Sequence, residues 1–444
     1  MPPGTRNIFA FAWFNAMAFQ IILGSPMVLY AKSLDASATT LGIIAGMMPL
    51  MVILQIPAAR YVDGVGYKRF VVSGWTVRSV FVALTALIPL ATGWLPAPSQ
   101  IALLLMLLFL FNLSRGISSC GWLPWVTSII PPSRRGRYLT LEASMVNAAS
   151  LVVFCLAAWV LGTHPSPWRF SALFGISALC SGISLVFLNR IPTERPIEPA
   201  RATDRPSIRD MLRLRPFRRL LSMNIAFALA NGGVLTFAVA FLKGMAGWPE
   251  QRILLLTSLM FIGGLANQLL AARALDSRGS KPLLIVASAL FAVTLAAWAA
   301  LAGRLLPLGT AAAAALMFSL GLCGSMLNLA NTRLAMITAP DIGRSHYFAV
   351  FSVVGSVTLG IAPILWGLLL DACGPLAVPF AGIEWNRYSI LFAVLSSLFL
   401  LTGALSLRIE EPAAASFETL LRDVLERSRI RYWIRLWFRA TPRG

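Results

Sequence analysis

Apolar stretches of roughly 20 residues, each nearly free of charge, recur along almost the whole of this 444-residue chain. An α-helix rises ~1.5 Å per residue, so a stretch of that length crosses the ~30 Å hydrocarbon layer of a bilayer. A soluble domain carries about 25% charged residues, whereas this chain has 12% and a mean hydropathy of +0.76. The pattern therefore predicts an all-α polytopic membrane protein.

Twelve of these stretches are predicted to form transmembrane helices. Their approximate bounds are 8–31, 38–60, 70–91, 101–130, 138–162, 168–189, 219–242, 251–274, 281–303, 306–338, 346–371 and 387–407. A charged, proline-rich segment after the sixth stretch divides them six and six. Such a segment is typical of a linker that lies outside the membrane.

The formal net charge of +20 would be compatible with nucleic-acid binding if the cations formed one patch. They are instead concentrated after spans 2, 4, 6 and 8, whereas each connection after an odd-numbered span holds at most two. Basic residues near span ends stay on the cytoplasmic side. We therefore predict an inner (plasma) membrane protein with both termini cytoplasmic and no nucleic-acid partner.

Metal and enzyme chemistry lack the residues they would need. Five cysteines are scattered singly, and the two histidines, His164 and His346, lie at span ends, so we expect no metal site and no cofactor. No GxxxxGK[ST] loop is present to bind nucleotide phosphates. The chain is not expected to be an enzyme.

The chain is expected to have four parts. Residues 1–190 form an N-terminal six-helix bundle, 191–218 a cytoplasmic linker, 219–407 a C-terminal six-helix bundle, and 408–444 a basic cytoplasmic tail. Within the linker, "SIRDMLRLRPF" favours a short surface helix. The tail places leucines and tryptophans at helical spacing among arginines, which indicates an amphipathic helix on the anionic inner leaflet or a helix that binds a protein partner.

One charged hinge is present twice. "AARYVDGVGYKRF" at 58–70 follows span 2, and "AARALDSRGSKPLL" at 271–284 follows span 8. The aligned pairs, at one constant offset, are Asp63 with Asp276, Gly66 with Gly279, and Lys68 with Lys281. The repeat predicts two pseudo-symmetric halves, an arrangement in which transporters bind substrate near the bilayer midplane.

Twelve spans in two halves with this hinge resemble the major facilitator superfamily. The signature of that family after span 2 is Gly-x-x-x-Asp-(Arg/Lys)-x-Gly-x-(Arg/Lys), and the chain matches it at Asp63, Gly66, Lys68 and Arg69. Ala59 replaces the leading glycine, and Gly64 replaces the cation after the aspartate. The resemblance implies the family fold, with two six-helix bundles around a shared site. We expect a monomer in the lipid bilayer.

The hinge residues are expected to act as a gate. Gly66 permits a tight reversal, and Lys68 and Arg69 anchor at the headgroups. Asp63 lies at the negative end of its own helix dipole and therefore needs a positive partner. The resemblance implies that this partner is the N-terminal end of span 11, whereas local pairing with Arg60 or Lys68 is the alternative. Asp276 and Arg278 are expected to make the mirror-related contact with span 5.

Spans 1, 4, 7 and 10 line the cavity in the family, so their polar residues are candidates for substrate contacts. These candidates are Asn15, Gln20, Arg115, Asn231 and Asn328. Hydrogen bonding between helices is the alternative role for the amides. Arg115 in the cavity would favour an anionic or carbonyl-bearing substrate, unless the arginine has a structural pairing.

Two further charged residues, Arg78 in span 3 and Glu142 in span 5, could contribute to coupling. The alternatives are that they pair with each other or that both extend to the membrane interface. We predict a secondary active transporter that moves a small, polar or anionic solute by rocker-switch alternating access. A transport-silent assembly factor, sensor or scaffold of the same fold is one alternative. A proton-coupled drug or metabolite exporter is the other, although span 5 lacks the glycine-proline motif of that group.

Overall fold

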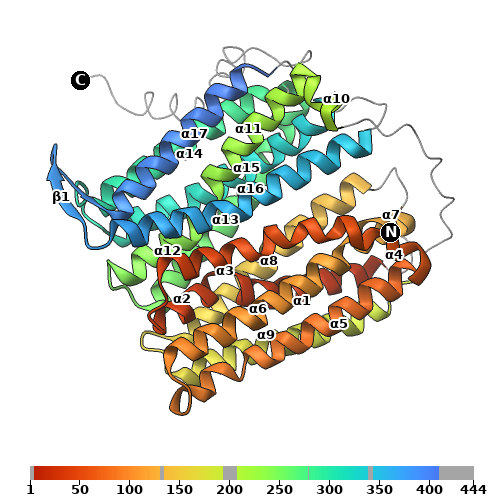
Figure 1. The fold of residues 1–444 in the computed structure, drawn as a ribbon, viewed down its shortest axis with the longest axis horizontal. Coiled ribbons are helices and arrows are strands. Elements are labelled where there is room, and N and C mark those ends of the chain that lie inside the picture. Colours follow the sequence, from red (N-terminus) through yellow and green to blue (C-terminus); the bar gives the residue numbers. More distant parts are fainter. Residues whose placement is uncertain (1–4, 131–134, 194–207, 279, 339–343, 410–444) are drawn as a thin grey trace, which may run out of the picture.

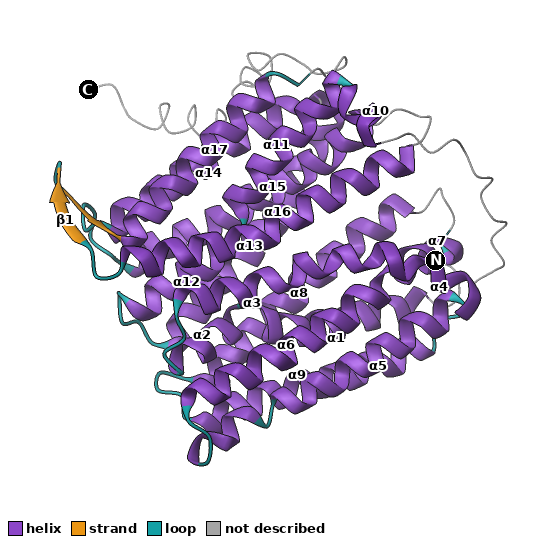
Figure 2. Cartoon of the chain, viewed as in Figure 1, coloured by secondary structure: helices purple, strands orange, loops and turns teal. Residues whose placement is uncertain are grey.

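The computed structural model describes residues 5–130, 135–193, 208–278, 280–338 and 344–409. Nearly all of these residues are helical (Figure 2). Besides helices and loops, the described residues include a short antiparallel hairpin of β1 (Ala377–Phe380) and β2 (Ile383–Asn386). The end of the molecule that carries this hairpin is called the hairpin face. The opposite end, where α9 ends and α10 begins, is called the linker face.

The N-terminal half contains nine α-helices and three short 3₁₀ segments among its described residues. They are α1 (Thr5–Leu23), α2 (Ser25–Ser33), α3 (Ala38–Leu50), η1 (Met51–Leu54), α4 (Gln55–Val65), α5 (Tyr67–Thr85), η2 (Ile88–Gly93), α6 (Ala97–Ser118), η3 (Ser119–Gly121), α7 (Trp122–Ile129), α8 (Arg135–Leu161) and α9 (Pro167–Asn189). Within this half, α1 packs on α8 and α9, and α5 packs on α6 and α9.

The described part of the C-terminal half follows the linker with eight α-helices and the hairpin. The helices are α10 (Ile208–Arg213), α11 (Arg215–Asn231), α12 (Val234–Gly244), α13 (Glu250–Arg278), α14 (Lys281–Ala302), α15 (Thr310–Thr338), α16 (Arg344–Cys373) and α17 (Arg387–Leu407). Here α14 packs on α15 and α17, and α11 packs on α16 and α17. The short α10 lies where a linker helix was predicted, and its Met211 is buried.

Figure 1 shows these two halves side by side, the first in red to yellow and the second in green to blue. The predicted fold of two helical bundles is therefore confirmed. Among the described residues, 11 helical segments are long and apolar enough to cross a membrane. The remaining predicted span corresponds to α13, which is 29 residues long.

Several predicted spans are not single straight helices. The first breaks at Gly24, before Pro26, into α1 and α2. The second changes to 3₁₀ geometry after Pro49, and the seventh breaks at Gly232–Gly233. Glycine and proline are the usual causes of such breaks, and in a membrane neighbouring helices satisfy the freed backbone groups.

The two halves meet most closely where α3 crosses α16, and the contact depends on small residues. A Cβ atom on Gly42 would lie 2.2 Å from the carbonyl oxygen of Pro363, and one on Gly46 would lie 2.2 Å from that of Gly360. Toward the hairpin face, a Cβ on Gly367 would lie 2.5 Å from the carbonyl oxygen of Ala38. Backbone therefore packs directly on backbone along this crossing.

This packing predicts different effects for two Gly→Ala substitutions. Gly42→Ala must push α3 away from α16, because a backbone carbonyl cannot move aside, and we expect a loss of about 1–3 kcal/mol. Gly175→Ala in α9 meets no atom within 4 Å, so it should be neutral or stabilising by up to ~1 kcal/mol. Thermal unfolding of the purified variants, followed by circular dichroism, measures both; equal melting temperatures would contradict the packing described.

Candidate functional site

A cavity of about 450 Å³ lies between the two halves. Leu23, Ala45, Met48, Pro49 and Asn147 line it from the N-terminal half, and α11 to α16 line it from the other. Polar side chains are few among mostly apolar neighbours: Asn147, Asn231, Thr236, Ser325 and Asn328. This composition is typical of a small-molecule site, in which a few polar groups orient the ligand.

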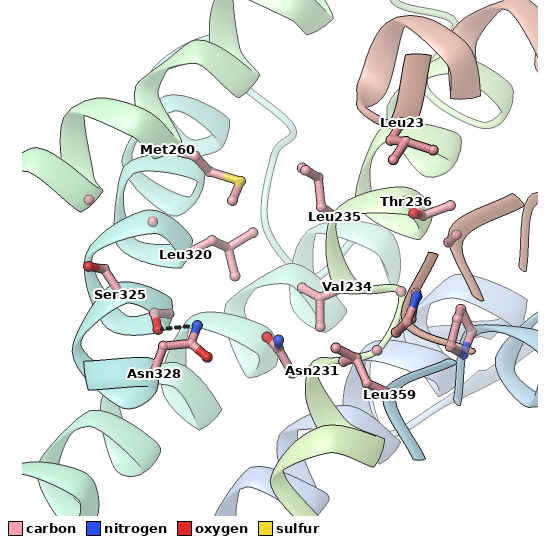
Figure 3. A pocket seen from close by; sticks show the side chains of 18 of the residues that line it. Leu23, Asn231, Val234, Leu235, Thr236, Met260, Leu320, Ser325, Asn328 and Leu359 are labelled. Carbon is pink, nitrogen blue, oxygen red and sulfur yellow. Dashed lines mark hydrogen bonds between the residues drawn. The ribbon is translucent and has the colours of Figure 1, made fainter. Parts of the chain in front are cut away.

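The break between α11 and α12 places Asn231 in this cavity. Asn231 is the last residue of α11, and Gly233 has a φ of 85°, a conformation that favours glycine. There is little room for a larger residue at the break, because a Cβ on Gly233 would lie 2.8 Å from the Phe237 ring. The next helix begins at Val234, and its first turn also lines the cavity (Figure 3).

Asn328 lies on α15, across the cavity from this break. Its amide nitrogen donates to the carbonyl oxygen of Gly324 at 3.0 Å, within its own helix, and the side chain is exposed. Figure 3 shows Asn231 and Asn328 on different helices that border the same space. The structure therefore brings these two predicted residues to one cavity.

The other five predicted cavity and coupling residues line a second cavity of about 230 Å³ inside the N-terminal half. They are Asn15, Gln20, Arg78, Arg115 and Glu142, and their neighbours include Phe11, Phe19, Trp75 and Trp122. The two cavities adjoin along α8, where Val146 lines the smaller one and Asn147 the larger. The predicted residues thus form two neighbouring clusters.

Arg78 is buried in the smaller cavity, with only 2% of its surface exposed. Its guanidinium donates to Oδ1 of Asn15, and its Cζ lies 4.6 Å from the centre of the Trp75 ring. Arg78 therefore does not extend to the membrane interface, and that alternative is wrong. The alternative of a pair with Glu142 is also not formed at ion-pair distance within the described part of the chain.

Arg115 lines the same cavity from α6. Its Cζ lies 5.1 Å from the centre of the Phe19 ring, and its Nη1 is buried without an acceptor. Among the described residues, no carboxylate is at ion-pair distance from either arginine. Burying charge without a counter-charge is costly, so two such groups in one cavity are unusual in a structural core.

The hinge after α4 is described in part. Gly66 has a φ of 86°, as expected for a tight reversal, and the Lys68 ammonium donates to the carbonyl oxygen of Ile191 at 2.8 Å. Ala59 and Arg69 are exposed, and Lys281 begins α14. Gly279, the side chains of Asp63, Asp276 and Arg278, and the tail 410–444 lie outside the described residues. The gate and the tail helix stay predictions.

Asp371 makes a contact between the halves that the sequence analysis did not identify. It lies near the C-terminal end of α16, at the hairpin face, and accepts hydrogen bonds from the backbone amides of Ala38 (3.0 Å) and Thr39 (2.8 Å). The Thr39 hydroxyl donates to the same carboxylate at 2.6 Å. Asp371, like Asp63, lies at the negative end of its own helix dipole and needs a positive partner, so the same reasoning could have identified it.

A second contact between the halves runs along α8 and α13. The Ser144 hydroxyl donates to Oε1 of Gln268 at 2.7 Å, and the Gln251 amide donates to the carbonyl oxygen of Gly162 at 3.1 Å. The Ser144–Gln268 bond therefore joins the two halves through side chains of α8 and α13.

Comparison with known proteins shows the family. The model of the Major Facilitator Superfamily matches residues 8–363. No curated protein matches the chain.

Solved structures show the same fold at low identity. A D-xylose–proton symporter matches with a TM-score of 0.73 and 12% identity, covering 92% of this chain and 98% of its own. A mutant of the nucleoside transporter NupG matches with a TM-score of 0.70 and 12% identity, covering 92% and 99%. An inward-open structure of the xylose transporter XylE from E. coli matches with a TM-score of 0.66 and 12% identity, covering 94% and 98%.

The Asp371 contact predicts a measurable opening of the hairpin face. Asp371→Asn removes the charge that interacts with the N-terminus of α3, which should weaken closure by about 1–2 kcal/mol. A shift of that size changes a conformational equilibrium by a factor of roughly 5–30. In a cysteine-free background, Leu235→Cys reports on the change, because Leu235 lines the larger cavity. We expect faster labelling by an impermeant maleimide added at the hairpin face.

Glu384→Gln is the matched control. Glu384 pairs with Arg304 at 3.1 Å on the same face, and both residues lie in the C-terminal half. A partly exposed pair of this kind is worth ~0–1 kcal/mol and does not join the halves. Equal labelling rates in the two variants would contradict the role given to Asp371.

Proposed function

Because this chain belongs to the Major Facilitator Superfamily, we propose that it is a secondary active transporter of a small polar or anionic solute, working by rocker-switch alternating access. The observation that carries the proposal is the cavity of about 450 Å³ between the halves. Residues of both halves line it, and the α3–α16 crossing and Asp371 join the halves on its hairpin side. A cavity with one closed end is what alternating access requires.

The positive-inside pattern supports a cytoplasmic linker face in an inner membrane. Arg60, Lys68 and Arg69 lie near that face, whereas the hairpin face carries scattered cations such as Lys32 and Arg304. Basic residues at span ends are retained on the cytoplasmic side. With this orientation both termini are cytoplasmic, and the state described is closed toward the outside.

Transport then needs the α3–α16 contact to open. Asp371 and the glycine contacts would separate on the outer side, while the two halves close on the inner side. In this proposal Asp63 and the second hinge, with Asp276 and Arg278, form the inner contacts of the opposite state. The proposed outer and inner contacts share one interaction, which is a carboxylate of one half placed at a helix N-terminus of the other.

Recognition is proposed to involve both cavities. Asn231 and Asn328 would bind polar groups of the solute from the C-terminal half, and Arg115 would attract negative or carbonyl-bearing groups from the N-terminal half. The matched transporters of xylose and nucleosides are 12% identical to this chain. The substrate class is therefore argued from the residues of this chain.

Glu142 supports proton coupling as a second possibility for the mechanism. It lines the smaller cavity beside Arg78 and Arg115, and a carboxylate inside the membrane is the kind of group that takes up and releases protons. A proton-coupled exporter is therefore retained as the alternative within transporters. Solute flux driven by a pH gradient would distinguish such an exporter from a transporter that is not coupled to protons.

Blocking the larger cavity tests the proposal. Asn231→Trp would fill the space at the α11–α12 break, so counterflow in proteoliposomes should fall at least about tenfold, or about 1.4 kcal/mol in the barrier. Val293→Trp is the control, because Val293 is 67% exposed on the outer surface of α14. The assay would use a panel of labelled sugars, nucleosides and organic anions.

The outcome also separates the proposal from the transport-silent alternative. A stable protein that gives no counterflow with any solute of the panel, and that co-purifies with a fixed protein partner, would favour a scaffold or sensor. Counterflow that Asn231→Trp leaves unchanged would mean that transport does not pass through this cavity.

A further inference from the structure

We propose that the smaller cavity, inside the N-terminal half, is an anion subsite, and that the solute is a compact organic anion with a flat apolar body. The inference deepens the proposed function and rests on it. The subsite consists of Arg78 and Arg115 as donors, Asn15 and Gln20 as polar neighbours, and aromatic walls.

The smaller cavity has an excess of positive charge. Two guanidinium groups, which stay protonated in proteins, line a space of about 230 Å³, and Glu142 is the single acidic side chain among its lining residues. Even with Glu142 ionised, one positive charge remains uncompensated. In a low-dielectric interior such a charge attracts an anion far more strongly than it would in water.

Both arginines of the smaller cavity have buried hydrogen-bond donors without acceptors. Arg78 is 2% exposed, and its Nε has no acceptor, while Nη1 of Arg115 is also buried without one. Unpaired buried donors are costly and rare in native proteins. A carboxylate or another oxyanion supplies the oxygen acceptors that guanidinium groups bind best.

The aromatic contacts hold both guanidinium groups in place. The Cζ of Arg78 lies over Trp75, at 4.6 Å from the ring centre, and 5.5 Å from the ring centre of Phe111. The Cζ of Arg115 lies 5.1 Å from the ring centre of Phe19. Cation–π contacts stabilise a charge without using its N–H groups, so donors stay available for a ligand.

The aromatic walls also indicate the body of the solute. The ring centres of Phe11 and Trp122 are 4.8 Å apart, and those of Trp75 and Trp122 are 6.4 Å apart. Rings grouped in this way offer flat apolar surfaces next to the two charges. An aromatic carboxylate has the matching combination of a charged oxygen pair and a flat ring.

A purely structural role for the arginines explains the cavity less well. A structural arginine is expected to have its donors satisfied by carboxylates or carbonyls, since apolar residues of similar size would otherwise be at least as stable. Here the described acceptor is a single one, Oδ1 of Asn15, which Arg78 shares with the Trp75 indole. The arrangement is that of a receptor for an anion.

Benzoate and its neutral analogue benzamide test the inference on the full-length protein in detergent. Trp75 and Trp122 line the cavity, so quenching of tryptophan fluorescence reports binding directly. We expect benzoate to bind at least tenfold more tightly than benzamide. Arg115→Gln should remove this preference, and Arg115→Lys should retain part of it.

Arg408→Gln is the matched control, because Arg408 is exposed at the end of α17 and lines neither cavity. Arg78→Gln is a second test. Because Arg78 is buried, this substitution could prevent folding, so the Arg115 variants decide the outcome. Equal binding of benzoate and benzamide, or benzoate binding unchanged in Arg115→Gln, would overturn the inference.

Failure of this inference and failure of the proposed function give different results. If benzoate binds as expected but no organic anion of the panel shows counterflow, the anion subsite is supported and the transport function is contradicted. If a neutral solute shows counterflow that Arg115→Gln leaves unchanged, the transport function is supported and the anion subsite is contradicted.

Discussion

The structure depends on how closely two helices from different halves approach each other. Hydrocarbon provides no hydrophobic force that drives helices together, so contact between them must come from tight packing and polar bonds. Gly42 and Gly46 on α3 meet Gly360 and Pro363 on α16 with backbone against backbone. The larger cavity begins beside this crossing, since Pro49 and Pro363 line it. The same small residues therefore hold the halves together and set one wall of the space between them.

Polar groups have satisfied hydrogen bonds in one region of the molecule and unsatisfied ones in another. At the hairpin face, Asp371 accepts three hydrogen bonds from the other half. In the smaller cavity, Arg78 and Arg115 keep buried donors without acceptors. Satisfied groups contribute to stability, whereas unsatisfied ones reduce it and are retained where they have another use. This contrast is the physical basis for assigning a contact between the halves to the hairpin face and solute recognition to the smaller cavity.

The fold was predictable because length, apolar composition and a repeated hinge are properties of the chain that no neighbour can alter. The approximate depth of each residue in the membrane follows from its position along its span, and Arg78 and Glu142, whose positions suggest similar depths, line one cavity. The direction of a side chain around its helix does not follow from it. Arg78 was expected to reach the interface as one alternative, but α5 turns it into the bundle toward Asn15.

Contacts between the halves were the harder part, since they depend on which state the molecule occupies. The rule that a terminal aspartate seeks the start of a helix in the other half was applied to Asp63. The described state shows that interaction at Asp371, on the opposite face. The side chain of Asp63 lies outside the described residues, and its gate stays a prediction.

The break at Gly232–Gly233 has a consequence for how the larger cavity responds to substitution. Amides in the first turn of a helix have no acceptor within that helix, and Val234, Leu235 and Thr236 begin α12 while lining the cavity. Part of the polarity of this wall therefore belongs to the main chain. Alanine substitutions would leave these main-chain amides in place. A residue of this wall could therefore appear dispensable in an alanine scan although its backbone amide contacts the solute.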